Sequence, residues 1–168
     1  MTGVVENQKQ TAAFAAHDHQ ACSGGVMDAA DRLAREAGLR LTPVRRRTLE
    51  ILLEEHRALG AYEVLDRLAK DGFAHQPPVA YRALNFLVKN GLAHRVRRLN
   101  AFTACMHPGI SHAPVFLICS SCDAVGEVPE AAASDALRRS ADRVGFQIER
   151  MNLEAVGICP TCREGADR

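Results

Sequence analysis

The chain has 168 residues, of which 47% are hydrophobic and 24% are charged, a composition typical of a globular protein with one or two small domains. This composition excludes a disordered chain and a fibre. The chain begins without a basic segment followed by an apolar one, and no apolar run is long enough to cross a bilayer, so we expect a cytoplasmic protein with no membrane partner.

The distribution of charge and the number of cysteines indicate the kinds of partner. Residues 26–98 carry 14 Lys and Arg against 9 Asp and Glu, whereas residues 99–168 carry 6 against 9. We therefore expect a polyanion to bind the middle segment. Six cysteines in a cytoplasmic protein are poor candidates for structural disulfides, so metal binding or redox chemistry is their expected use.

Residues 1–25 lack sustained periodicity and end in Ser-Gly-Gly, which predicts a flexible tail. His17, His19 and Cys22 of this segment are potential metal ligands. A polar tail without a metal site is the favoured interpretation, because the segment has no pattern that would hold these side chains in place.

Three helices are expected next, at Asp28–Ala37, after Thr42-Pro43, and at Tyr62–Lys70. Threonine caps free N–H groups and proline suits the first helical position, so the second start is well marked. Glycine follows the first and third helices and ends them. The side chains expected to face the core are Leu33, Ala34 and Ala37, then Val44, Thr48, Ile51 and Leu52, then Val64, Leu65 and Leu68.

A fourth helix begins at Pro77-Pro78, is closed by Gly91 and has two different faces. The inward face comprises Val79, Ala83, Phe86 and Leu87, and the outward face comprises Tyr81, Arg82, Asn85 and Lys89. Arginine pairs bidentately with guanine, asparagine pairs with adenine, and lysine neutralises phosphate. The outward face therefore suits DNA, although an ordinary solvated face explains this helix alone equally well.

Two short strands flank a polar turn at Arg98–Asn100 and carry three arginines, Arg95, Arg97 and Arg98. Helices followed by a basic hairpin predict a winged helix-turn-helix, in which the helix before the hairpin enters the major groove. Arg45, Arg46 and Arg47 add to the basic surface, but three consecutive side chains of a helix cannot all face one partner.

The character of the sequence changes after Cys105. Strands are expected at residues 115–119 and 123–128, a helix at 129–145 and an alternating strand at 146–159. These elements predict a second, α+β domain. The expected organisation is a tail at 1–25, a winged-helix DNA-binding domain at 26–98, a hinge at 99–108, and a dimerisation and metal-binding domain at 109–168.

Cys119-x-x-Cys122 and Cys159-x-x-Cys162 are separated by 36 residues, and each pair is expected where a strand ends in a turn. This spacing is typical of a tetrahedral Zn(II) site with four thiolates and no open position, which is structural. Its binding energy, roughly 10–16 kcal/mol in small zinc modules, contributes to folding. A redox pair requires a helix N-terminus after its first cysteine, and neither pair has a clear helix there.

Four further side chains have ligand chemistry and are left over from the cysteine pairs: His94, Cys105, His112 and Glu127. Each alone is more often an ordinary surface or core residue. Together they come from the basic domain, the boundary and the second domain, so a metal held by all four would span the hinge.

The chain resembles the ferric uptake regulator (Fur) family of metal-dependent repressors, and most of all its zinc-sensing branch. The resemblance covers residues 26–162 and rests on LTPVRRRTLEIL, AYEVLDRL, PPVAYRALNFLVKNGLAHRV, FTAC, HAPVFLICSSCDAVGEV and GICPTC. It implies an α+β fold with an N-terminal winged helix-turn-helix and a small dimerisation domain. It also implies a homodimer that binds palindromic operator DNA.

The resemblance implies two zinc ions per chain. The structural zinc falls on Cys119, Cys122, Cys159 and Cys162, and the sensing zinc falls on His94, Cys105, His112 and Glu127. It places DNA contacts on Tyr62 and Arg82, to which the residues themselves add Tyr81, Asn85, Lys89 and Arg45. His107 is a spare ligand, ranked below His112 because His112 keeps the family's offset of seven residues from Cys119.

Iron-sensing members carry a histidine-rich run with an aspartate ahead of the first cysteine pair, whereas this chain has only Ser111-His112-Ala113-Pro114. One thiolate, two imidazoles and one carboxylate suit tetrahedral zinc better than six-coordinate iron. We therefore expect a zinc-responsive repressor of zinc uptake genes.

An iron- or peroxide-sensing repressor of the same family is the nearest alternative. We expect neither an enzyme nor a small-molecule substrate, because four protein ligands leave no open position on the metal. A zinc ribbon that docks protein, with an incidental basic face, is the remaining alternative.

Overall fold

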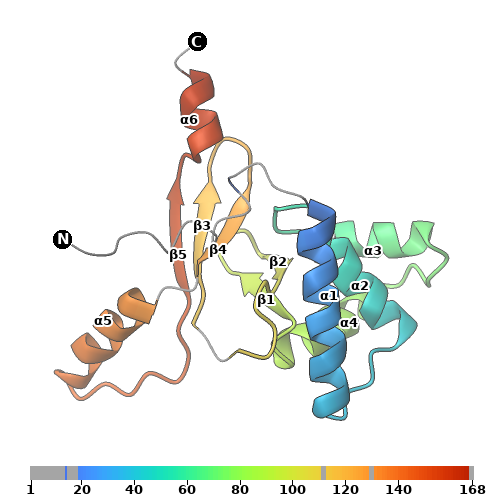
Figure 1. Ribbon diagram of the computed structural model, residues 1–168, viewed down its shortest axis with the longest axis horizontal. Coiled ribbons are helices and arrows are strands. Elements are labelled where there is room, and N and C mark those ends of the chain that lie inside the picture. The colour runs from blue at the N-terminus through green and yellow to red at the C-terminus, as the bar shows by residue number, and fades with distance from the viewer. Residues whose placement is uncertain (1–13, 15–18, 111–112, 129–130, 167–168) are drawn as a thin grey trace. The chain divides into compact units, whose positions relative to one another are not determined.

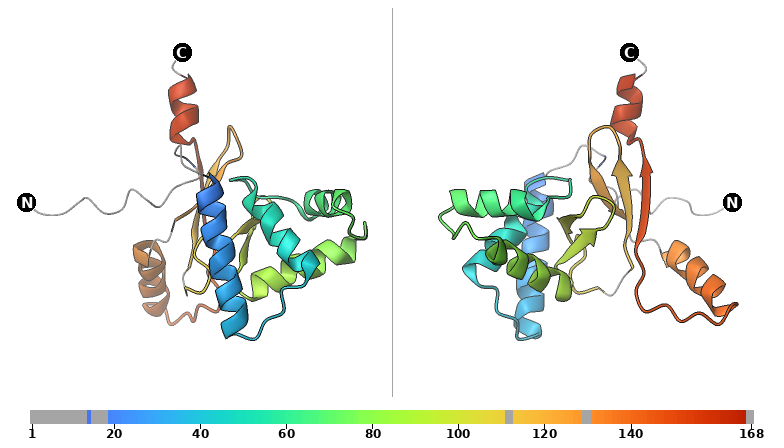
Figure 2. Two further views of the ribbon diagram at one scale, coloured as in Figure 1. Left: turned by 45° about the vertical axis from the view of Figure 1, so that its right-hand side comes forward. Right: turned by 180° about the vertical axis from the view of Figure 1, so that it is seen from behind.

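The computed structural model describes Phe14 and residues 19–110, 113–128 and 131–166. It divides into two compact units (Figures 1 and 2). Residues 17–110 form one, here called the helical unit, and residues 1–16 with 111–168 form the other, here called the sheet unit. The predicted α+β fold is confirmed. No helix among the described residues is both long and apolar enough to cross a membrane.

The helical unit contains four helices and a hairpin. They are α1 (His19–Glu36), α2 (Pro43–Leu53), α3 (Ala61–Lys70), α4 (Pro77–Lys89), β1 (Ala93–Val96) and β2 (Ala101–Ala104). Proline occupies the start of α2 and α4, as predicted, while Thr42 makes no side-chain cap hydrogen bond. At α3, Glu63 Oε2 accepts a hydrogen bond of 3.0 Å from the Gly60 N–H. Proline therefore marks the starts of α2 and α4, and the Glu63 side chain marks the start of α3.

Helix α1 begins earlier than predicted. It starts at His19 rather than at Asp28, so Ser23, Gly24 and Gly25 lie within a helix and not in a tail. The reason is burial, because Val26, Ala30 and Ala34 lie in the core beside α2. That burial offsets the cost of the two glycines, about 1 kcal/mol each in a helix interior. Of the side chains expected inside, Leu33 is half-buried and Ala37 is exposed.

A leucine-rich core joins α2, α3, α4 and the hairpin. The prediction for α2 and α3 is confirmed for Thr48, Ile51, Leu52, Val64, Leu65 and Leu68, which are all buried, whereas Val44 is half-buried at the edge of the core. On α4 the buried set is Ala80, Ala83, Leu84 and Leu87, whereas Val79 and Phe86 are half-buried. The buried stripe is therefore rotated toward Ala80 and Leu84 relative to the wheel, because α2 and α3 both pack on that side.

The hairpin pairs β1 with β2 in antiparallel register, His94 opposite Thr103. Its turn places Asn100 in the left-handed region, with φ 47°. Leu59 adds an isolated bridge to Phe102, with two hydrogen bonds of 2.8 Å. The segment at 99–108, expected to be a hinge, thus includes a paired strand, and the helical unit continues to Ile110.

The sheet unit contains β3 (Val115–Cys119), β4 (Val125–Val128), α5 (Ala131–Asp142), β5 (Leu153–Gly157) and α6 (Pro160–Ala166). The strand order is β4-β3-β5, with β4 antiparallel and β5 parallel to β3. Both predicted strands around the first cysteine pair are present. The last strand is shorter than expected, because residues 146–152 are not extended in a ladder.

Candidate metal centres and nucleic-acid interface

The outer face of α4 consists of Tyr81, Arg82, Asn85 and Lys89, and all four are exposed. They lie opposite the buried stripe of the same helix, as the wheel predicted. No ion pair among the described residues involves Arg82 or Lys89. No described residue therefore neutralises the positive charge of this face.

Tyr62 and Arg45 lie on other helices of the same unit. Tyr62, in the first turn of α3, is 64% exposed. Arg45 of α2 stacks its guanidinium over the ring of Phe86 on α4, 3.6 Å from the centroid, and donates a hydrogen bond of 2.7 Å to the Arg40 carbonyl. The helical wheel assigned Phe86 to the core, but its ring also makes a cation–π contact with Arg45.

The other two arginines of the predicted basic run have acidic partners. Arg46 pairs with Asp31 of α1, and Arg47 pairs with Asp71 at 2.6 Å and with Glu54 at 2.9 Å. The hydrogen bond from Arg46 is the main reason why the pKa of Asp31 lies below its ordinary value. The expectation that the three arginines cannot all face one partner is therefore confirmed.

The hairpin carries the remaining basic side chains. Arg95, Arg97 and Arg98 are all exposed. Arg95 donates a hydrogen bond to the Asn100 side chain and lies 5.8 Å from the centroid of Phe102. The Asn100 turn thereby orients one arginine of the hairpin.

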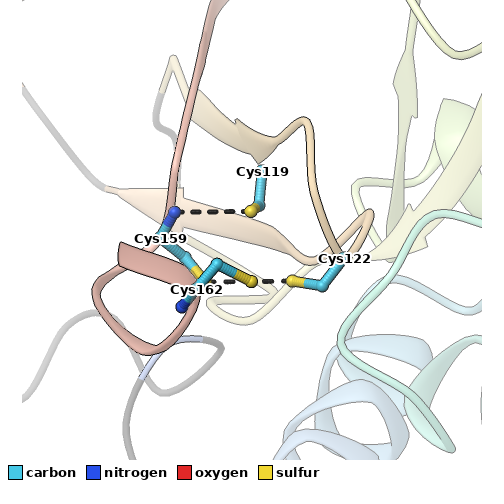
Figure 3. A group of neighbouring side chains, drawn as sticks. All are labelled: Cys119, Cys122, Cys159 and Cys162. Carbon is cyan, nitrogen blue, oxygen red and sulfur yellow. Dashed lines mark hydrogen bonds between the residues drawn. The ribbon is translucent and has the colours of Figure 1, made fainter. Parts of the chain in front are cut away.

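The four cysteines of the C-x-x-C pairs come together at one end of the sheet (Figure 3). Cys119 ends β3 and Cys159 follows β5 by two residues. Since β3 and β5 are parallel neighbours, their carboxyl ends lie side by side. This pairing brings together two cysteine pairs that are 36 residues apart in the sequence. The four Sγ atoms lie within 4.8 Å of one another.

The spacing of the sulfur atoms suits a tetrahedral ion. Cys122 Sγ lies 3.8 Å from Cys159 Sγ. A Zn–S bond of about 2.3 Å gives a tetrahedral edge of about 3.8 Å, whereas a disulfide would need about 2.05 Å. The contact also joins one thiol from each pair, so the thiols form a single group and not two separate couples.

Backbone N–H groups point at the sulfur atoms, as Figure 3 shows for Cys159. The Cys159 N–H donates to Cys119 Sγ at 3.3 Å, and the Cys162 N–H donates to Cys159 Sγ at 3.5 Å. With N–H donors on Cys122 and Ser121, the Cys159 donor lowers the pKa of Cys119 to about 6. These donors favour a thiolate, which is the form that binds a metal.

Two of the other thiols, those of Cys122 and Cys162, favour the neutral form. The hydrogen bond from the Ala124 N–H lowers the pKa of Cys122. The hydrogen bond between Cys122 and Cys119, burial, and the thiols of Cys162 and Cys159 outweigh this effect and raise the pKa of Cys122 to about 12. The pKa of Cys162 is also raised, because the lowering effect of Ser121 is outweighed by Cys159 and burial. A divalent ion at the centre of the group is what would allow four thiolates at neutral pH.

The structure corrects one argument against redox chemistry. Helix α6 begins at Pro160, directly after Cys159, so the second pair does have a helix after its first cysteine. Helix α6 is only seven residues long and includes Gly165, so it has no clear helical periodicity in the sequence. The joint cluster of four thiols, and not the lack of a helix, is therefore the evidence that favours a metal.

The other predicted ligands are divided between the units. In the helical unit, His94 of β1 and Cys105, just after β2, bring a ring nitrogen and Sγ within 4.8 Å of each other. Glu127 of β4, in the sheet unit, is buried with 7% exposure. His112 lies outside the described residues. His107 is half-buried in the helical unit.

The comparisons with known proteins agree with one another. The model of the ferric uptake regulator family matches residues 36–156. The zinc uptake regulation proteins of Escherichia coli K12 and Shigella flexneri are each 32% identical over 136 residues, which is 80% of this chain and 80% of theirs.

Two solved structures share the fold along most of the chain. Holo XcZur is 37% identical, with a TM-score of 0.76, and the match covers 84% of this chain and 99% of that one. A zinc uptake regulator complexed with zinc and DNA is 30% identical, with a TM-score of 0.79, and covers 87% and 98%. The chain belongs to the ferric uptake regulator family, whose members are transcription regulators and not enzymes.

Proposed function

We propose that the protein is a zinc-responsive transcriptional repressor that acts in the cytoplasm. It binds palindromic operator DNA as a homodimer when its sensing site holds zinc, and it controls zinc uptake genes. The curated relatives named zinc uptake regulation protein, and the solved relative with zinc and DNA, support this proposal. DNA binding is assigned to residues 26–98, and dimerisation to 109–168.

The observation that carries the proposal is the position of two ligands on the hairpin. His94 lies on β1 and Cys105 follows β2, so an ion held there would bind both strands of the predicted wing. The wing directly follows α4, whose outer face carries Arg82 and Lys89, both exposed and neither ion-paired among the residues that the structure describes. The candidate metal ligands therefore lie next in the chain to the helix that is proposed to bind DNA. A metal-dependent DNA-binding switch requires such a connection between the two sites.

For DNA binding, the outer face of α4 enters the major groove. Arg82 and Asn85 read base edges, while Lys89 and Tyr81 lie along the phosphates. Arg45, held against Phe86, and Tyr62 at the start of α3 bind the backbone or bases beside this helix. In a dimer the two α4 helices meet successive major grooves, which is why the operator is palindromic.

Two zinc ions per chain have different tasks. The spacing of the thiols and their N–H donors support zinc at the four-cysteine group. Cys119, Cys122, Cys159 and Cys162 would hold the structural ion. His94, Cys105, His112 and Glu127 would hold the sensing ion, with His107 as a spare ligand.

Regulation follows if the sensing ligands are drawn from both units. Bound zinc supplies a tetrahedral centre that neutralises the thiolate and the carboxylate. His94 and Cys105 would hold this ion from the wing, and Glu127 and His112 would hold it from the sheet unit. Without those bonds the chain turns at the carboxyl end of the predicted hinge, after β2. A coupling of about 1–3 kcal/mol, or about 5- to 150-fold in DNA affinity, is typical.

The test is a DNA-binding titration at buffered free zinc, with a palindromic duplex selected in vitro. We expect the wild type to bind more tightly as zinc rises, and Cys105→Ser and His94→Gln to lose this response. His75→Gln is the matched control, since His75 is an exposed histidine of the same unit that pairs with Asp66. A full zinc response in Cys105→Ser would contradict the assigned sensing site.

The same titration with ferrous iron separates the nearest alternative. A repressor of the iron-sensing type would respond to iron at concentrations where zinc has no effect. The proposal predicts the reverse order, because one thiolate, two imidazoles and one carboxylate favour four-coordinate zinc.

A further inference from the structure

Phe14 contacts the sheet unit at a point where only glycine fits. A Cβ placed on Gly126 of β4 would lie 2.6 Å from Phe14 Cε2, 3.0 Å from Cζ and 3.3 Å from Cδ2. Separations under 3.0 Å are not found in real side chains, so the phenyl ring lies directly on the backbone of β4. Gly126 is buried under this ring.

The contact lies on the same face of the sheet as Cys119. Gly126 and Ala155 both pair with Leu117, so these three residues form one row across β4, β3 and β5. Cys119 is two residues beyond Leu117 on β3 and pairs with Gly157, which makes the next row. Because side chains alternate along a strand, both rows point to the face that Phe14 covers.

Among the described residues, little else covers this face. Leu117 is half-buried, and Ala155 and Gly157 are exposed, whereas Phe116 and Ile118 of the opposite face are buried. Small residues at 126, 155 and 157 leave an apolar hollow around Leu117, which continues from Phe14 to Cys159 and Pro160. The ring of Phe14 lines this hollow and lies on Gly126 of β4.

We propose that Phe14 is a positioning residue of the four-cysteine centre. Its ring holds β4 against β3, one row from Cys119, and so keeps the turn with Cys119 and Cys122 closed over the ion. The inference rests on the proposed structural zinc. Its consequence is kinetic, because an ion held by four thiolates leaves only when a cysteine turn opens.

The contact itself is tested without metal. The chain contains no tryptophan, so Phe14→Trp introduces a single emission signal. We expect a blue-shifted emission that shifts to the red when Gly126→Ala is added. Gly157→Ala is the matched control, because a Cβ there meets nothing within 4 Å. The proposal is overturned if the emission maximum of Phe14→Trp equals that of the unfolded chain. It is also overturned if adding Gly126→Ala does not change this maximum.

The effect on zinc is tested by transfer to a chromogenic chelator from the full chain. Cys105→Ser is used as the background, so that the released ion comes from the four cysteines. We expect Phe14→Ala to speed release on the order of fivefold, given the partial burial of a phenyl ring, and Phe14→Leu to restore part of the loss. Gly126→Ala should speed release when Phe14 is present and have no effect in Phe14→Ala.

The outcomes distinguish two failures. If zinc is released slowly and Phe14→Ala releases it at the same rate, the positioning role is wrong while the proposed function stands. If Gly126→Ala and Phe14→Ala are additive, the two residues act separately and the proposal also fails. If the Cys105→Ser chain holds no zinc at all, the structural zinc of the proposed function is itself contradicted.

Discussion

The two units stabilise themselves by different means. The helical unit has a continuous apolar core, built mainly of leucine from α2, α3, α4 and the hairpin. Among the described residues of the sheet unit the buried apolar ones are few, and two of them are Cys119 and Cys159, which we propose as metal ligands. A small unit with so little apolar burial needs another source of stability. We infer that one unit folds on hydrophobic burial and the other on metal binding.

Loss of a structural ligand should give the largest difference between the units. Cys119→Ser removes a thiolate from the four-cysteine group, and much of the roughly 10–16 kcal/mol that such sites supply to folding would be lost. We expect the sheet unit to unfold while the helical unit stays folded. Hydrogen exchange measured by mass spectrometry would show this by region. Thr161→Ala, an exposed residue of the second cysteine turn, is the control. Equal protection of both units in Cys119→Ser would break the comparison.

A cavity in the core of the helical unit should destabilise the protein more than the loss of an apolar side chain from the sheet unit. Leu84 is fully buried at the centre of α4, so Leu84→Ala is expected to cost about 2–5 kcal/mol. Leu137 of α5, in the sheet unit, is 43% exposed, so Leu137→Ala should cost far less. Denaturant unfolding followed by circular dichroism measures both. Similar losses in the two variants would show that apolar burial does not distinguish the units.

The two units are also expected to differ in their contribution to DNA affinity. Arg82→Ala removes an exposed cation of α4 that has no acidic partner among the described residues, and should weaken operator binding by about 1–3 kcal/mol. Arg139→Ala, on the exposed surface of α5, removes the same charge from the sheet unit and should have almost no effect. Fluorescence anisotropy with labelled operator, repeated at several salt concentrations, compares them. An equal loss from Arg139→Ala would place DNA contacts on both units.

The smallest expected effect compares two turns. Asp123, next to Cys122, has φ 58°, and Asn100 of the hairpin has φ 47°. Glycine adopts this region without strain, so Asp123→Gly should stabilise the sheet unit by about 1 kcal/mol or less. Asn100→Gly gains the same relief but loses the hydrogen bond from Arg95, so we expect almost no net change. Thermal unfolding of the zinc-loaded protein is the measurement, and destabilisation by Asp123→Gly would contradict it.

Local patterns predicted the elements better than they predicted which surface each element buries. Proline and glycine marked α2, α3 and α4 closely, because these residues act through their own backbone. The buried face of α4 was displaced toward Ala80 and Leu84, since it depends on where α2 and α3 lie. Likewise, Ser-Gly-Gly predicted a tail, but burial of Val26 and Ala30 against distant residues extended α1 through it.

The candidate sites show the same limit. Residue type and spacing alone selected the two C-x-x-C pairs and the polar face of α4, because thiolate pairs and helical periodicity are local properties. The contact between Arg45 and Phe86 and the contact between Phe14 and Gly126 had no local signal. Each joins residues far apart in the chain, and no pattern within either segment refers to the other.

By itself, then, the sequence determined the ligand types, the basic middle segment and most helix starts, since these depend on single residues and their near neighbours. Only the tertiary structure decided that Cys119 and Cys159 meet, because that requires β5 to return parallel to β3 with its carboxyl end at the same edge. It also decided which arginines keep their charge available. Arg46 and Arg47 are neutralised by acids that the fold brings to them, whereas Arg82 has no acidic partner in the described part of the chain.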